Sequence, residues 1–190
     1  MTHSWNSARP IVALVVGVNA AGKSVFSREF ASAMERSAYV EVDELRYKVV
    51  GGLVAHRRGI NPAEAPKEYA LQCDLACRNA VVLAGVFTAA GFSVVIDGVS
   101  EACAQRREWL HHEIPGCEIV TVGIYCSEAV LEARRAERGW PSTLPPGTAK
   151  KLSWYSRNEG HMDYVVDTGK ATREGYLDVL RHLAQRAKMS

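Results

Sequence analysis

Short apolar runs alternate along the chain with longer stretches in which apolar residues recur at helical spacing. Five runs predict β-strands, at residues 11–16, 38–42, 93–97, 119–125 and 164–167. Three of them are nearly continuous in Val and Ile, which is typical of strands covered on both faces. The alternation predicts a parallel sheet wound with right-handed crossovers, whose ligands gather at the carboxyl ends of the strands.

The stretches between these runs predict helices. After residue 24, an apolar stripe recurs at i, i+4, i+7 and i+8, formed by Phe26, Phe30, Ala33 and Met34. A longer helix follows the segment "NPAEAP"; one of its faces carries Leu71, Leu75, Val82 and Val86, and Gly91 supplies its left-handed end. Four hydroxyl residues precede helical stretches and are predicted N-caps: Ser100, Ser127, Thr148 and Thr172.

The segment "VVGVNAAGKS" (residues 15–24) has the spacing of a phosphate-binding loop, between a predicted strand and a predicted helix. Backbone N–H groups and the helix N-terminus would face phosphate oxygens there. Lys23 can reach the β- and γ-phosphates, and the Ser24 hydroxyl can bind Mg²⁺. The residues expected to contact a nucleotide are Gly17, Asn19, Ala20, Ala21, Gly22, Lys23, Ser24 and Val25.

Two carboxylates are predicted at the ends of neighbouring strands, on the same edge as the phosphate loop. Asp97 follows "SVVI" and fits a carboxylate that binds Mg²⁺ directly or through water. Asp43 follows "VEV" and is placed to orient an acceptor hydroxyl and take its proton. Either could instead be a helix cap, with Glu41 and Glu44 as alternative carboxylates. Arg46, one turn beyond Asp43, is a candidate for holding a polar or anionic acceptor, or an ordinary surface arginine.

A basic helix precedes the proline-rich loop "WPSTLPPG" (residues 140–147). Arg134 and Arg138 lie four residues apart and therefore share a face. Arginines that a closing lid brings over the γ-phosphate neutralise developing charge and exclude water. We therefore predict a lid around residues 134–150; the alternative is an exposed helix whose arginines pair with Glu132 and Glu137.

Composition narrows the class of protein. The 190 residues suffice for one domain, with 47% hydrophobic and 23% charged residues, as in soluble globular proteins. A net charge of +2 gives no reason to expect binding to nucleic acid or an anionic membrane. Five cysteines without zinc-like pairing predict reduced thiols. The first ten residues lack the apolar centre of a signal peptide, no apolar run approaches the length of a membrane span, and we expect a cytoplasmic location.

Several segments together resemble chloramphenicol phosphotransferase, which belongs to a wider group of small phosphate-loop kinases with zeta-toxin-like and polynucleotide-kinase-like members. They are "GVNAAGKS", "VEVDELR", "VVIDGV", "YCSEAVLEARRAERG" and "HMDYVVDTG", and the resemblance runs from about residue 11 to the last helix. It implies that Lys23 and Ser24 contact ATP and Mg²⁺, that Asp43 is the base, and that Arg134 and Arg138 are lid arginines. The chain departs from the family pattern at Gly98, at Trp140-Pro141, and between Tyr47 and Glu68.

We therefore predict one α/β domain over residues 1–190 (core 11–189), a three-layer sandwich of the phosphate-loop, nucleoside-monophosphate-kinase-like class. Its five-stranded parallel sheet would have the order 2-3-1-4-5, and acceptor-side helices would lie around residues 44–90. The predicted activity is transfer of the ATP γ-phosphate to a hydroxyl of a small molecule such as an antibiotic, with Mg²⁺. One alternative is a kinase of a nucleotide-sugar or a nucleic-acid end, which the near-neutral charge disfavours. Another is a nucleotide-dependent switch without an acceptor. The sequence does not determine the oligomeric state.

Overall fold

The computed structural model describes residues 9–55, 59–104, 106–141, 143–170, 179 and 182. Strands and helices alternate along these residues. The strands are β1 (Ile11–Gly17), β2 (Ser37–Glu41), β3 (Ser93–Asp97), β4 (Glu118–Tyr125) and β5 (Tyr164–Asp167). The helices are α1 (Lys23–Ala33), α2 (Val42–Arg46), α3 (Pro66–Ala89), α4 (Glu101–Ala104), α5 (Arg107–Glu113), α6 (Glu128–Glu137) and α7 (Thr148–Ser156).

The five strands form one parallel sheet in the order β2-β3-β1-β4-β5, which confirms the predicted topology. β1 lies at the centre, and its first six residues are almost completely buried, which explains its unbroken apolar sequence. In the register of the sheet, Val15 of β1 lies beside Asp97, and Asp97 lies beside Glu41. The carboxyl ends of the three strands therefore meet at one edge.

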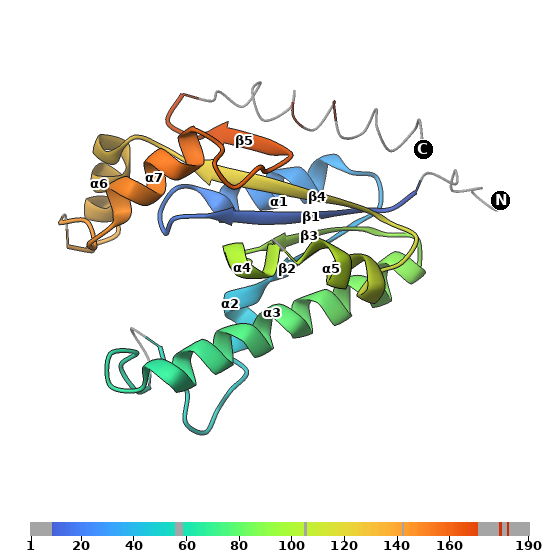
Figure 1. Ribbon diagram of the computed structural model, residues 1–190, viewed down its shortest axis with the longest axis horizontal. Coiled ribbons are helices and arrows are strands. Elements are labelled where there is room, and N and C mark those ends of the chain that lie inside the picture. The colour runs from blue at the N-terminus through green and yellow to red at the C-terminus, as the bar shows by residue number, and fades with distance from the viewer. Residues whose placement is uncertain are drawn as a thin grey trace.

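Helices cover both faces of the sheet. α1 packs on β1, β2 and β3 from one face, and it lies behind the sheet in Figure 1. α3, α4, α5 and α7 pack on the other face, as right-handed crossovers from β2, β3 and β4 require. The phosphate loop, α2, α4 and the start of α7 consequently meet at the carboxyl edge of the sheet.

The face that α3 buries is not the one with its large apolar residues. Leu71, Leu75, Val82 and Val86 are exposed by 48–64%. The buried face consists instead of short or polar side chains: Gln72, Ala76, Cys77, Ala80, Val81 and Ala84. Three alanines at i, i+4 and i+8 let the helix backbone lie close to β2 and β3, which longer side chains would prevent. With 24 residues and an 18-residue window of mean hydropathy 1.3, α3 also meets the length and composition criterion for a membrane span, contrary to our expectation of no such run, although one of its faces packs on the sheet.

The observed helix ends confirm two of the predicted N-caps and show that the predictions of Thr148 as a cap and of Asp43 as the end of a strand were wrong. Ser127 caps α6 and Ser100 caps α4, each accepting a hydrogen bond from a backbone N–H three residues on. Thr148, however, is the first residue of α7: the N-cap is Gly147 at φ 81°, a left-handed conformation that favours glycine. β2 ends at Glu41, so Asp43 does not close the strand and lies instead in the first turn of α2. The predicted cap Thr172 lies outside the described residues.

Candidate active site

The phosphate loop leaves β1 and enters α1 in a conformation that its small residues make possible. A Cβ atom on Gly17 would collide with the carbonyl oxygen of Ile124 on the neighbouring strand. Gly22, the N-cap of α1, has φ 98°, and Ala20 also has a positive φ of 69°. Left-handed backbone at a non-glycine residue is uncommon and occurs preferentially at functional sites. The loop thus turns within five residues and places the N-terminus of α1 at the carboxyl edge of the sheet.

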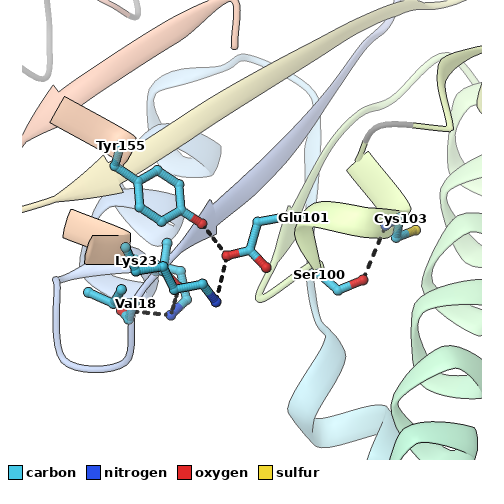
Figure 2. A network of polar contacts seen from close by, with 8 residues as sticks. Val18, Lys23, Ser100, Glu101, Cys103 and Tyr155 are labelled. Carbon is cyan, nitrogen blue, oxygen red and sulfur yellow. Dashed lines mark hydrogen bonds and ion pairs between the residues drawn. The ribbon is translucent and has the colours of Figure 1, made fainter. Parts of the chain in front are cut away.

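Lys23 points back into this loop. Its Nζ donates to the carbonyl oxygens of Gly17 and Val18 at 3.0 and 3.1 Å (Figure 2). Burial lowers the pKa of Lys23, and the surrounding carboxylates, Asp97 first among them, only partly offset that effect. A buried cation held by two carbonyl oxygens is poised to exchange them for stronger, charged phosphate acceptors.

Asp97 is the most buried carboxylate of the site, at 2% exposure. Its Oδ2 accepts a hydrogen bond from the Tyr39 hydroxyl at 3.0 Å. Its Oδ1 is buried and has no hydrogen-bond partner among the residues that the structure describes. A buried carboxylate oxygen without a partner is costly unless a cation or an ordered water occupies the space in front of it.

These groups fit a magnesium ion. The cleft is lined by Ser24 as well as Asp97, which provides a hydroxyl and a carboxylate oxygen. In the described part of the chain, no group of three His, Cys, Asp or Glu side chains forms a complete metal site. Mg²⁺ characteristically takes one or two protein oxygens and completes its shell with water and substrate phosphates.

Asp43 faces the same cleft from α2. Its side chain is 61% exposed, and Oδ1 accepts a hydrogen bond from Arg46 Nη2 at 3.0 Å. Asp43 does not cap α2, because the N-cap is Glu41 and no side chain caps that helix. Arg46 itself is 6% exposed, donates to the Val54 carbonyl and lies about 5 Å from the ring of Tyr69. Arg46 is therefore engaged with the protein and orients Asp43.

Arg134 of α6 fastens the phosphate loop to the end of β5. Its Nη1 donates to the Ala21 carbonyl at 3.0 Å and to the Thr168 hydroxyl at 2.9 Å, and its Nη2 donates to the Thr168 carbonyl at 2.9 Å. Arg138, one turn further, is the C-cap of α6 and lies 5.6 Å from the Trp140 ring, on the wall of the cleft. The two arginines therefore occupy different environments: Arg134 is bonded to the phosphate loop and Thr168, whereas Arg138 lines the cleft.

A carboxylate and a lysine that the sequence interpretation missed join the site from α4 and α7. Glu101 Oε1 accepts a hydrogen bond from the Tyr155 hydroxyl and lies 2.9 Å from Lys151 Nζ (Figure 2). Burial alone would raise the pKa of Glu101, but the bonds from Tyr155 and Lys151 outweigh it and lower that pKa. The sequence signal that could have indicated Glu101 is an acidic residue four positions beyond Asp97, just after a predicted helix cap.

The phosphate loop, α2, α3 and the start of α7 line a common cleft of about 650 Å³. It is lined by most of the predicted site residues, namely Gly17, Asn19, Ala20, Gly22, Lys23, Ser24, Val25, Asp43, Arg46, Asp97 and Arg138. Ala21 and Arg134 lie behind this lining, in contact with each other. The lining also includes Tyr47 from the end of α2 and three residues of α3, namely Tyr69, Cys73 and Cys77, which together form the α2–α3 wall of the cleft. This wall lies within the region of residues 44–90 predicted to hold the acceptor.

Comparisons with known proteins bear on the family and the fold of this chain. The profile of the family described as chloramphenicol phosphotransferase-like protein matches residues 10–184. Three solved structures share the fold, each covering more than nine tenths of both chains. A tunicamycin resistance protein from Deinococcus radiodurans has 17% identity and a TM-score of 0.59 over 94% of this chain and 95% of its own. A shikimate kinase from Bacteroides thetaiotaomicron has 15% identity and a TM-score of 0.59 over 95% and 99%. A sugar kinase from Janibacter sp. HTCC2649 has 14% identity and a TM-score of 0.58 over 93% and 95%. A search of curated protein sequences gave no match.

Proposed function

The chain belongs to the chloramphenicol phosphotransferase-like family of small phosphate-loop kinases, and on this premise we propose that it transfers the ATP γ-phosphate to a small molecule's hydroxyl. The observation that carries the proposal is the shared cleft. Lys23 and Ser24 of the phosphate loop line the same cavity of about 650 Å³ as Asp43, the carboxylate on its acceptor side. A switch without an acceptor would need the loop but not an accessible carboxylate facing it.

The reaction would proceed by in-line attack. The acceptor oxygen forms a bond to the γ-phosphorus while the bond from that phosphorus to the β,γ-bridging oxygen breaks, and ADP leaves. The proton of the attacking hydroxyl passes to Asp43, whose second oxygen stays free when Arg46 holds Oδ1. Lys23 would give up the Gly17 and Val18 carbonyls for phosphate oxygens as charge moves onto the leaving ADP.

Ser24 and Asp97 would hold a magnesium ion, which when bound neutralises phosphate charge. The buried, unpartnered Oδ1 of Asp97 supports this assignment. Tyr39 keeps the Asp97 carboxylate in place from β2, and the hydrogen bond to Asp97 contributes, after burial, to raising the pKa of Tyr39. Tyr39 therefore remains a protonated donor at neutral pH.

Arg138 would act on the phosphates, with the segment around residues 134–150 closing over ATP, and Arg134 would act through the Ala21 carbonyl of the phosphate loop, to which it donates. Arg138 already lines the cleft, and Lys151 at the start of α7 is a further cation of that lining. Excluding water in this way directs the phosphoryl group to the acceptor and away from hydrolysis.

We take the acceptor to be a small molecule, with an antibiotic hydroxyl as the first candidate class. The α2–α3 wall of the cleft, where we place the acceptor, carries the rings of Tyr47 and Tyr69. Among the described residues of this wall the one cation is Arg46, which is bound to Asp43. A net charge of +2 offers no basic track for a nucleic acid. The five cysteines are all free, which fits a reducing compartment such as the cytoplasm, where ATP is abundant.

The test is a screen of hydroxyl-bearing small molecules with labelled ATP and Mg²⁺, scored for ADP release that depends on the added molecule. We expect at least one compound to become labelled, and Lys23→Ala to abolish the labelling. Steady ATP hydrolysis that no acceptor stimulates would instead support a nucleotide-dependent switch and reject the kinase proposal.

A further inference from the structure

One face of α3 concentrates the exposed apolar surface of the protein. Among the described residues, nine large hydrophobic side chains are exposed, and five of them lie on α3: Leu71, Leu75, Val82, Leu83 and Val86. At 100° per residue, Leu71, Leu75, Val82 and Val86 fall within an arc of about 60°. Contiguous apolar surface of this kind on a soluble domain marks an interaction site.

The spacing of this stripe is symmetric about its own midpoint, between Arg78 and Asn79. Leu71 and Val86 are equidistant from that point, and so are Leu75 and Val82. If two such helices lie antiparallel across a two-fold axis at the midpoint, Leu71 faces Val86 of the other copy and Leu75 faces Val82. A self-complementary patch of this type is what a two-fold interface requires.

We propose that the protein forms a two-fold symmetric dimer through this face of α3, with a second copy of the chain as the partner. The charged residue near the axis does not oppose this pairing. Arg78 forms an ion pair with Asp74 at 2.8 Å on the same helix, so its charge is already compensated. Its counterpart across the axis is Asn79, whose amide oxygen can accept from the guanidinium.

The area is sufficient for a reversible dimer. With full exposures of roughly 170 Å² per Val and 200 Å² per Leu, the four residues of the stripe expose roughly 430 Å², so pairing removes on the order of 900 Å² from water. That value is at the lower end of specific interfaces, and we expect association in the micromolar range.

The proposed dimer is independent of the kinase proposal. Tyr69, Cys73 and Cys77 line the cleft from other faces of α3, whereas the stripe faces away from the sheet. Substitutions in the stripe should therefore leave nucleotide binding intact, and loss of one property does not imply loss of the other.

Sedimentation of the full chain over a range of micromolar concentrations tests the association. We expect a mass approaching twice 20.8 kDa for the wild type, and the monomer mass for Val82→Glu and Leu75→Glu. Val50→Glu is the matched control, because Val50 is 94% exposed and lies outside the stripe; it should dimerise as the wild type does. A monomeric wild type, or a Val82→Glu variant that still dimerises, would overturn the proposal.

Disulfide trapping tests the register. Leu75→Cys and Val82→Cys proteins, mixed and oxidised with copper phenanthroline, should form a covalent dimer, because residue 75 faces residue 82 of the partner. Neither variant alone should do so, since like positions lie about 10 Å apart along the helices. Wild type treated identically controls for the five native cysteines. Equal trapping in all samples would contradict the dimer. So would a monomeric protein that binds phosphatidylcholine vesicles in a flotation assay, because the stripe would then contact lipid.

Discussion

Arg134 provides a quantitative test of how the phosphate loop is held. Arg134→Ala removes three hydrogen bonds of 2.9–3.0 Å that the guanidinium donates. These bonds join the phosphate loop to the residue that follows β5. A hydrogen bond to a charged group contributes about 1.5–3 kcal/mol, but Arg134 is only partly buried and water can replace part of what is lost. We therefore expect the variant to lose about 2–3 kcal/mol of unfolding free energy, well below the sum of the three bonds.

For a chain of this size, about 2–4 °C of melting temperature corresponds to 1 kcal/mol, so Arg134→Ala should melt roughly 4–12 °C lower by calorimetry. Arg134→Lys should recover only part of the loss, because an ammonium cannot make the two-pronged contact with Thr168. Glu132→Ala, an exposed truncation on the same helix, should stay within about 0.5 kcal/mol of wild type. If Arg134→Ala and Glu132→Ala melt alike, the proposed fastening does not exist.

Three further substitutions test other parts of the account. Glu101→Gln should lower the free energy of unfolding at pH 7, and the difference from wild type should shrink as pH falls below about 4.5. Because folding lowers the pKa of Glu101, its carboxylate stabilises the protein above its unfolded pKa, and this stabilisation is lost as the folded carboxylate is protonated. Urea titrations at pH 7 and pH 4 would measure the difference. Gly22→Ala should reduce the stabilisation of the protein by ATP in thermal shift assays, whereas Gly52→Ala, also at positive φ but with open space around it, should cost stability without changing the ATP response. Gly123→Ala should destabilise the protein by about 1–3 kcal/mol in chemical denaturation, because its Cβ would enter the space of the Met162 sulfur and crowd the Tyr155 ring of α7; an unchanged denaturation midpoint would show that Met162 and Tyr155 do not pack tightly on β4.

The sheet and the phosphate loop were predictable because their signals are local. β1, β3 and β4 are covered on both faces, so they appear in the sequence as unbroken apolar runs. The phosphate loop is one contiguous segment whose glycines are needed for its own backbone geometry. The parallel direction of the strands follows from their alternation with helices, whereas their order was predicted from the phosphate-loop fold class that the loop indicated.

The parts that were mistaken or missed depend on contacts between distant segments. The buried face of α3 is marked by alanines, and a pattern of large apolar residues cannot reveal it. Glu101 and Lys151 are fifty residues apart and meet only because α4 and α7 pack on the same face of the sheet. The role of Arg46 as a partner of Asp43 likewise depends on its burial under Tyr69, from the following helix.

The central claim is that Asp43 faces the phosphate loop as the base for an acceptor hydroxyl. The most direct measurement compares wild type with Asp43→Asn in single-turnover phosphate transfer to the acceptor found by screening, with ATP affinity measured by calorimetry on the same samples. We predict that transfer falls by about 10²–10⁴-fold while ATP affinity stays unchanged, since a general base contributes to the transition state and not to donor binding. An Asp43→Asn protein that transfers phosphate at the wild-type rate would contradict the account.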